Sequence, residues 1–100
     1  MQILSEKRGQ VVRARILGEL DHHTAASTRE SLDKLLGEDV REMVLDLSGL
    51  TFMDSSGIGV LIGRYKVLTA RGGKLKVPKP NAQIDKILKL SGLYSILDKA

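Results

Sequence analysis

The sequence contains no cysteine and no tryptophan, and Phe52, Tyr65 and Tyr94 are its only aromatic residues. Without cysteine the chain can form neither a disulfide nor a thiolate metal site, so we expect it in the cytoplasm. Three scattered aromatic side chains do not form the stacking platform that proteins use to bind single-stranded nucleic acid. The adjacent histidines, His22 and His23, are not spaced as two metal ligands on one helix, so no metal site is predicted.

Long hydrophobic runs are also missing. The fully apolar runs are only a few residues long, far below the roughly 20 residues of a membrane-spanning helix. Residues 1–6 lack the basic start and the apolar core of a signal peptide. We therefore expect a soluble protein that does not act at a membrane. Hydrophobic residues make up 42% of the 100 residues, which is sufficient for one hydrophobic core and predicts a single domain over residues 1–100.

Positive charge is concentrated in the second part of the chain. Residues 1–63 carry a net charge of −3, and residues 64–100 carry a net charge of +7. A basic segment is one property of nucleic-acid-binding proteins. Here, however, Lys74 and Lys76 alternate with apolar residues, which is typical of a solvated face. Together with the scarcity of aromatic residues, this pattern predicts that the chain does not bind nucleic acid. The alternative role for the basic segment is to bind an acidic protein partner.

Hydrophobic periodicity predicts an α/β fold. Alternating apolar and basic residues indicate a strand with one exposed face, and helical spacing followed by glycine indicates a helix and its end. In chain order, we expect a short edge strand at 3–4, a strand at 11–17, a helix that follows residues 18–24, has Asp21 as its N-cap and ends at Gly37, and a strand at 43–47. After these come a loop at 48–53, a helix from about 56 to 71, a strand at 74–77, a connector at 78–81, a last helix that stops at Ser91-Gly92, and a closing element of unassigned type at 93–97. Strands that alternate with helices predict a small mixed sheet with packed helices and parallel crossovers in its second half.

The stretch Asp54-Ser55-Ser56-Gly57 joins a buried strand to the apolar central helix. Either serine is a suitable N-cap, because a serine hydroxyl can accept a hydrogen bond from a free backbone N–H. If one serine caps the helix, the other hydroxyl stays free at a helix end that attracts anions. A phosphate added there, next to Asp54, would change the local charge strongly. The stretch is therefore a candidate modification site, and the simpler interpretation is that both serines only cap the helix.

Other chemistry fits this stretch less well. A receiver domain in which Asp54 accepts phosphate needs an adjacent acidic pair after an early strand, whereas here a leucine separates Glu19 from Asp21. A hydrolase elbow needs glycine two residues before its serine, which neither serine has. The glycine-rich run at 57–63 has one residue too many for a dinucleotide-binding loop. We therefore predict no catalytic residue.

The central helix carries a second apolar stripe in addition to the stripe that is expected to face the core. At the 3.6-residue helical period, this stripe falls opposite the expected core residues Ile58, Leu61 and Leu68. Small residues on it would let a partner approach the helix backbone, and exposed apolar patches commonly mark interfaces. Burial against a neighbouring helix is the alternative. The predicted partner-binding residues are Gly59, Val60, Gly63 and Val67.

Two separated motifs, at residues 18–24 and 52–59, resemble the STAS domain of anti-sigma factor antagonists, in particular the antagonists that act in sporulation. The resemblance extends over the whole chain. It implies a STAS-type fold and phosphorylation of the serine directly after the motif aspartate, which is Ser55 here. It also implies that Asp21, Asp54, Ser56 and Gly57 lie near the phosphorylated serine.

The same resemblance implies the partners. The unphosphorylated form would bind an anti-sigma factor and release the sigma factor, and the anti-sigma factor, itself a serine kinase, would inactivate the chain by phosphorylating Ser55. A serine phosphatase would reverse the modification. ATP and its metal would belong to the kinase, so we expect the chain to need no cofactor and to be no enzyme. The alternatives are a STAS subunit of another partner-switching pathway, such as a stress response, and a nucleotide-binding domain.

Overall fold

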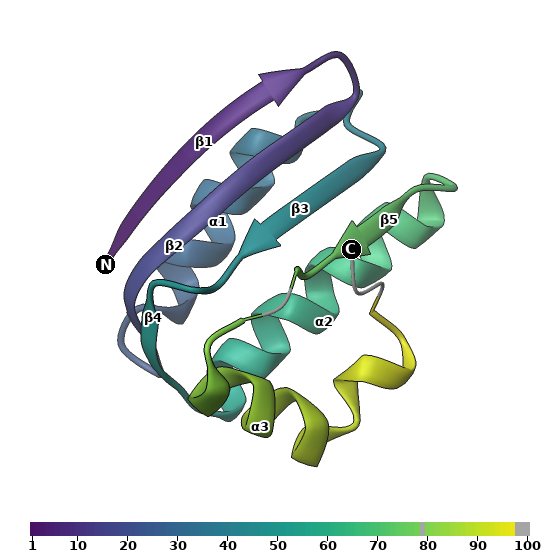
Figure 1. Ribbon diagram of the computed structural model, residues 1–100. Helices are drawn as coiled ribbons and strands as arrows, with labels where there is room; N and C mark the ends of the chain where they lie inside the picture. Colours follow the sequence, from purple (N-terminus) through teal and green to yellow (C-terminus); the bar gives the residue numbers. More distant parts are fainter. Residues whose placement is uncertain (79, 98–100) are drawn as a thin grey trace.

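The computed structural model describes residues 1–78 and 80–97. In this part of the chain, helices cover one face of a five-stranded sheet (Figure 1). The elements, in chain order, are β1 (Gln2–Arg8), β2 (Val11–Leu20), α1 (Ala25–Leu36), β3 (Glu42–Asp46), β4 (Leu50–Met53), α2 (Ser55–Ala70), β5 (Lys74–Lys76), α3 (Ala82–Ser91) and the short 3₁₀ helix η1 (Leu93–Ser95). The strand order is β1-β2-β3-β5, and β4 also pairs with β2. β1 is antiparallel to β2 and the other pairs are parallel, which confirms the predicted α/β fold with a small mixed sheet.

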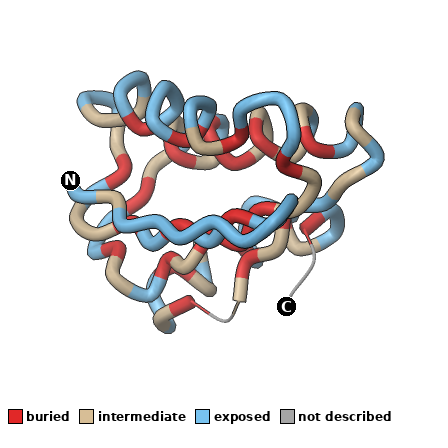
Figure 2. Tube along the Cα trace, turned by 90° about the horizontal axis from the view of Figure 1, so that it is seen from above, coloured by how far each residue is buried: buried red, intermediate tan, exposed pale blue. Residues whose placement is uncertain are grey.

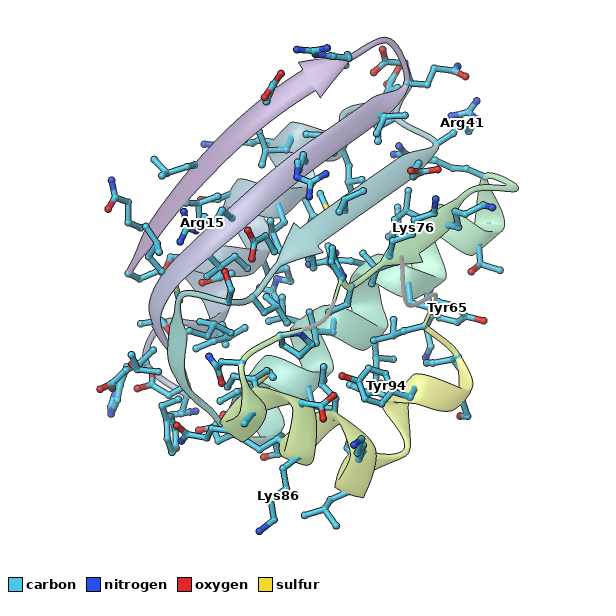
Figure 3. All side chains as sticks on the ribbon, in the orientation of Figure 1. Arg15, Arg41, Tyr65, Lys76, Lys86 and Tyr94 are labelled. Atoms are coloured by element: carbon cyan, nitrogen blue, oxygen red, sulfur yellow. The ribbon has the colours of Figure 1, made fainter. Side chains whose placement is uncertain are left out.

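The central strand β2 shows why only one face of the sheet is covered. Val12, Ala14 and Ile16 are completely buried under the helices, whereas Arg13 and Arg15 between them are exposed. Successive side chains of a strand point to opposite faces, so the arginines define an open face. Figure 3 shows Arg15 on this side of the sheet. The predicted strand with one exposed face is confirmed.

Helices α1 and α2 lie side by side on the covered face and enclose the core. Leu32 of α1 and Leu61 and Leu68 of α2 are completely buried, and each such side chain contributes about 1.5–3 kcal/mol to folding. Figure 2 shows that the buried residues face the space between the helices and the sheet. Helix α3 packs at the end of the sheet next to β4. No helix in the described ranges is long and apolar enough to cross a membrane.

The loop expected at 48–53 is partly a strand, so that prediction was wrong. Leu50 and Met53, the two ends of β4, are buried, and β4 runs parallel to the last residues of β2, from Gly18 to Leu20, with a β-bulge after Gly18. Periodicity did not show this strand because its two middle residues are both exposed, which breaks the alternation. The pairing has a functional consequence, because it brings the two sequence motifs side by side.

The two ends of the described chain are also more regular than expected. The edge strand expected at 3–4 extends over all of β1. The closing element of unassigned type begins with η1, and Leu93 and Leu97 are both buried in the core cluster. Apolar burial therefore fixes this last segment against the rest of the domain.

Candidate functional site

The aspartate before helix α2, not a serine, caps the helix. Oδ1 of Asp54 accepts hydrogen bonds from the backbone N–H groups of Ser56 at 2.8 Å and Gly57 at 3.3 Å. The prediction of a serine cap was therefore wrong. Aspartate caps as well as serine does, and its charge is favourable at the positive end of a helix. As a result, neither Ser55 nor Ser56 is needed for capping.

Ser55 is the first residue of α2, and it is exposed. Within the described ranges, its hydroxyl makes no hydrogen bond. Ser56 is half-buried and lines a groove between two helices. The Ser55 hydroxyl is thus the more accessible of the two to another protein.

The turn before α1, residues 21–24, holds its shape by internal hydrogen bonds. Oδ1 of Asp21 accepts from the N–H groups of His23 at 2.8 Å and Thr24 at 3.1 Å. The Thr24 hydroxyl accepts from the Asp21 N–H at 3.0 Å and donates to the Glu19 carbonyl at 2.9 Å. The N-cap position of α1 is Thr24, so the prediction that Asp21 caps this helix was wrong.

These hydrogen bonds also keep Asp21 negatively charged. Desolvation makes the largest contribution and raises the pKa of the Asp21 carboxyl, but the hydrogen bonds from Thr24 and His23 outweigh it together and lower the pKa below its usual value. A carboxyl with a lowered pKa is ionised at neutral pH. Asp21 and its turn are therefore a fixed negative group.

Asp54 connects this turn to the start of α2. Its second oxygen, Oδ2, accepts a hydrogen bond from the His22 N–H at 3.2 Å, and its own N–H donates to the Leu20 carbonyl at 3.4 Å. The Thr51 hydroxyl adds a bond to the Gly18 carbonyl at 3.2 Å. The two motifs, joined here by hydrogen bonds between residues 32 and 33 positions apart, consequently form one continuous surface around Ser55.

Gly57 lets the first turn of α2 pack directly on this junction. A Cβ at residue 57 would lie 2.6 Å from Met53 Cγ, 2.9 Å from Leu20 Cγ and 2.9 Å from the Leu20 carbonyl oxygen. Real side chains do not approach so closely, and one of the contacts is with backbone. Glycine at this position is therefore a packing requirement.

We expect Gly57→Ala to destabilise the domain by about 1–3 kcal/mol, because the added methyl group overpacks the junction. Urea unfolding measures the effect. Gly59→Ala is the matched control on the same helix, since a Cβ at residue 59 meets no atom within 4 Å. This control should be as stable as the wild type or more stable by up to about 1 kcal/mol, the helix propensity gained. Equal stability of the two variants would contradict the packing argument.

A groove of about 460 Å³ lies between α1 and α2. Its mouth includes His22, and its walls are Ala25, Ala26 and Arg29 from α1 and Ser56, Gly59 and Val60 from α2. Two of the predicted partner-binding residues, Gly59 and Val60, thus line it. Gly63 follows one helical turn later with open space at its Cβ position, and Val67 is half-buried against the core.

The structure corrects the orientation predicted for Val60. The side chain is only 6% exposed and belongs to the core cluster, whereas the helical period placed it opposite the core. The reason is that α1 packs beside α2 and covers this side of the helix. Val60 is therefore the floor of the groove and is not an outward-facing residue.

Arg64 is a buried charge on α2. The residue is 5% exposed, and its Nε lies 3.1 Å from Oδ1 of Asp33 on α1. The geometry of this ion pair is not that of a directed hydrogen bond, because Nε and Nη1 have no hydrogen-bond partner within the described residues. Desolvation lowers the pKa of Arg64, and the Asp33 carboxylate opposes this effect. The pair connects α1 to α2.

Comparison with known proteins identifies the family. The STAS domain family matches residues 2–99 of the chain. An anti-sigma F factor antagonist from Paenibacillus polymyxa is 40% identical over 98 residues, which cover 97% of this chain and 84% of the relative. An anti-sigma-B factor antagonist from Bacillus subtilis is 34% identical over 89 residues, which cover 87% of this chain and 79% of the relative. The chain belongs to the STAS domain family.

Solved structures agree with this assignment. The anti-sigma factor antagonist SpoIIAA in its unphosphorylated form has a TM-score of 0.73 and 28% identity, covering 89% of this chain and 83% of SpoIIAA. The Bacillus cell fate determinant SpoIIAA in its phosphorylated form has a TM-score of 0.76 and 30% identity, covering 99% of this chain and 91% of SpoIIAA. A Thermotoga maritima protein superimposes better, at a TM-score of 0.89, but its 22% identity supports the fold alone.

Proposed function

We propose that this chain is an anti-sigma factor antagonist that binds an anti-sigma factor kinase in its unphosphorylated form, releases the sigma factor, and is inactivated by phosphorylation of Ser55. The observation that carries the proposal is the exposed Ser55 hydroxyl, which stands at the positive end of α2 and is free because Asp54 caps the helix. The antagonists among its relatives, and the phosphorylated form of SpoIIAA, support it.

The chain is then a kinase substrate in the cytoplasm and no enzyme, and a serine phosphatase restores its active form. ATP and its metal are bound by the kinase, so this chain needs no cofactor of its own. The relatives include an antagonist of anti-sigma F factor at 40% identity and an antagonist of anti-sigma-B factor at 34% identity. Because the identity is higher, 40%, to the antagonist of anti-sigma F factor, we propose anti-sigma F factor as the first candidate partner.

Phosphorylation of Ser55 inactivates the chain by adding negative charge at the surface on which the partner packs. A phosphate on Ser55 adds a charge of about −1.5 to −2 at neutral pH, next to Asp54 and near the ionised Asp21. The helix end accepts the phosphate favourably, by about 0.3–1 kcal/mol, so the domain itself tolerates it. A partner that packs closely on this surface would have to desolvate the added charge. Binding is therefore lost while the fold is retained.

The groove between α1 and α2 is the docking surface for the anti-sigma factor in this proposal. Ser56, the residue after Ser55, lines it, and its lining includes the apolar side chains of Ala25, Ala26 and Val60. Arg29 stands exposed at its edge and forms no ion pair with another described residue. We therefore expect the partner to insert an apolar side chain next to a carboxylate that pairs with Arg29. The docking stripe predicted on α2, Gly59, Val60, Gly63 and Val67, thereby gains a second wall from α1.

The test is incubation with the anti-sigma F factor of Paenibacillus polymyxa and ATP, followed by intact-mass analysis and peptide mapping. We expect one phosphoryl group, located on Ser55, and a stable complex only with the unmodified chain. A parallel incubation with the anti-sigma-B factor of Bacillus subtilis tests the alternative that the chain serves another partner-switching pathway. Absence of both a complex and a modification with either partner would contradict the function, and phosphate on Ser56 would overturn the assignment of Ser55.

A further inference from the structure

We propose that Asp54 is a positioning residue whose carboxylate ties the turn at 21–24 to the start of α2, so that the kinase meets this turn and Ser55 as one recognition surface. The proposal rests on the proposed function of Ser55. It adds a role for a residue that neither accepts the phosphate nor binds the partner's groove-filling side chain.

The two oxygens of Asp54 have different tasks. Oδ1 caps α2 by accepting from Ser56 and Gly57, whereas Oδ2 accepts from the His22 N–H at 3.2 Å. Capping alone requires one acceptor oxygen, which a serine would supply equally well. The hydrogen bond to the second oxygen is therefore not needed for capping. It joins Asp54 to His22, which is 32 residues away in the sequence.

The other hydrogen bond at this junction, from the Asp54 N–H to the Leu20 carbonyl, holds the residue before the turn and none of residues 21–24. The remaining hydrogen bonds of the turn are internal or lead to Glu19 and to the start of α1. Among the described residues, the bond between Asp54 and His22 is the one hydrogen bond that joins residues 21–24 to residues 54–57. Because the turn is internally rigid, fixing one backbone N–H fixes the position of the whole turn.

Losing this bond would move the turn relative to Ser55 without unfolding it. The hydrogen bonds of Asp21 and Thr24 within the turn would keep its shape, and the N–H of the exposed His22 would form a hydrogen bond to water instead. The mouth of the groove would change as well, because His22 lines it. A kinase that contacts both sides of the junction would then bind a less defined surface, which raises KM more than it lowers kcat.

His22 offers a pair of variants that both lack the imidazole and differ in whether they keep the backbone N–H that Asp54 holds. The Thr24 N–H bonds to the Asp21 carbonyl at 3.2 Å, so His22 occupies the second position of a β-turn, where proline is favoured. His22→Pro removes the N–H that Asp54 holds, and His22→Ala removes the same imidazole but keeps the N–H. Both variants leave the charge of Asp54 in place.

The kinetic experiment measures phosphorylation of the full chain by the anti-sigma F factor of Paenibacillus polymyxa with ATP. Loss of a hydrogen bond to a charged acceptor changes an equilibrium constant by about tenfold or more. We therefore expect the KM of His22→Pro to exceed that of His22→Ala by about tenfold. The change in kcat should be much smaller. Equal KM values for the two variants would overturn the proposal, with circular dichroism confirming that both are folded.

A second measurement requires no kinase. Asp54→Asn keeps a good N-cap oxygen but turns an amide donor toward the His22 N–H. We expect hydrogen exchange of the His22 amide to become about tenfold faster, as for the loss of one charge-assisted bond, while the Ser56 amide stays protected. Asp46→Asn is the control, since Asp46 holds the Ser48 N–H at 2.9 Å in a separate turn. Unchanged His22 exchange overturns the tie, whereas a wild-type chain that is not phosphorylated contradicts the proposed function instead.

Discussion

Ser55→Ala is expected to abolish phosphorylation completely and to leave binding to the anti-sigma factor intact, which makes the chain permanently active. The hydroxyl is exposed, and it is not used to cap α2. Its removal should therefore change the free energy of unfolding by no more than about 0.5 kcal/mol. Intact-mass analysis after incubation with the kinase and ATP measures the first effect, and size-exclusion chromatography of the complex measures the second.

Ser56→Ala is the matched control, because it removes the neighbouring hydroxyl and leaves Ser55 in place. This variant should gain one phosphoryl group like the wild type. Ser55→Asp should imitate the modified form only in part, since a carboxylate carries a single charge and phosphate about −1.5 to −2. A phosphoryl group on Ser55→Ala would show that another residue is the acceptor.

Gly63→Leu is expected to weaken binding of the anti-sigma factor by at least tenfold, or about 1.4 kcal/mol, without a loss of stability. A Cβ at residue 63 meets no atom within 4 Å, so the leucine side chain would extend from α2 toward the docking partner. Leucine is also a better helix former than glycine, which should stabilise the domain by up to about 1 kcal/mol. Calorimetric titration with the anti-sigma factor and thermal unfolding measure the two effects.

Thr69→Leu provides the control for added apolar bulk. Thr69 is exposed on the same helix, but the helical period turns it away from the groove. Its replacement should leave the affinity unchanged. If Gly63→Leu lowered the melting temperature strongly, the stripe would be part of the core, and docking across it would be contradicted.

Local patterns were sufficient for much of the fold. Alternation identified the covered and open faces of β2, and glycines at 37 and 92 correctly marked the ends of α1 and α3. These signals work because strand period and helix termination depend on neighbouring residues. Strand β4 escaped them because its pairing with the end of β2 is a tertiary contact.

Helix α2 shows where periodicity becomes ambiguous. The helix is apolar around most of its circumference, so its sequence does not decide which side faces the sheet and which faces α1. The helical period therefore placed Val60 outside, although it is buried, and it gave no sign that Arg64 is buried beside Asp33. A charged side chain is normally read as exposed, and only its partner on another helix explains its burial.

The sequence by itself determined the α/β class, the position of Ser55 at the start of a helix, and the two motifs that identify a STAS domain, because each depends on residues close together in the chain. Only the tertiary structure decided that Asp54 has a second partner in His22, that α1 supplies the other wall of the groove, and that Ser55 is the freer of the two hydroxyls. These features depend on contacts between segments about 30 residues apart, which the pairing of β4 with β2 brings together and no local pattern encodes.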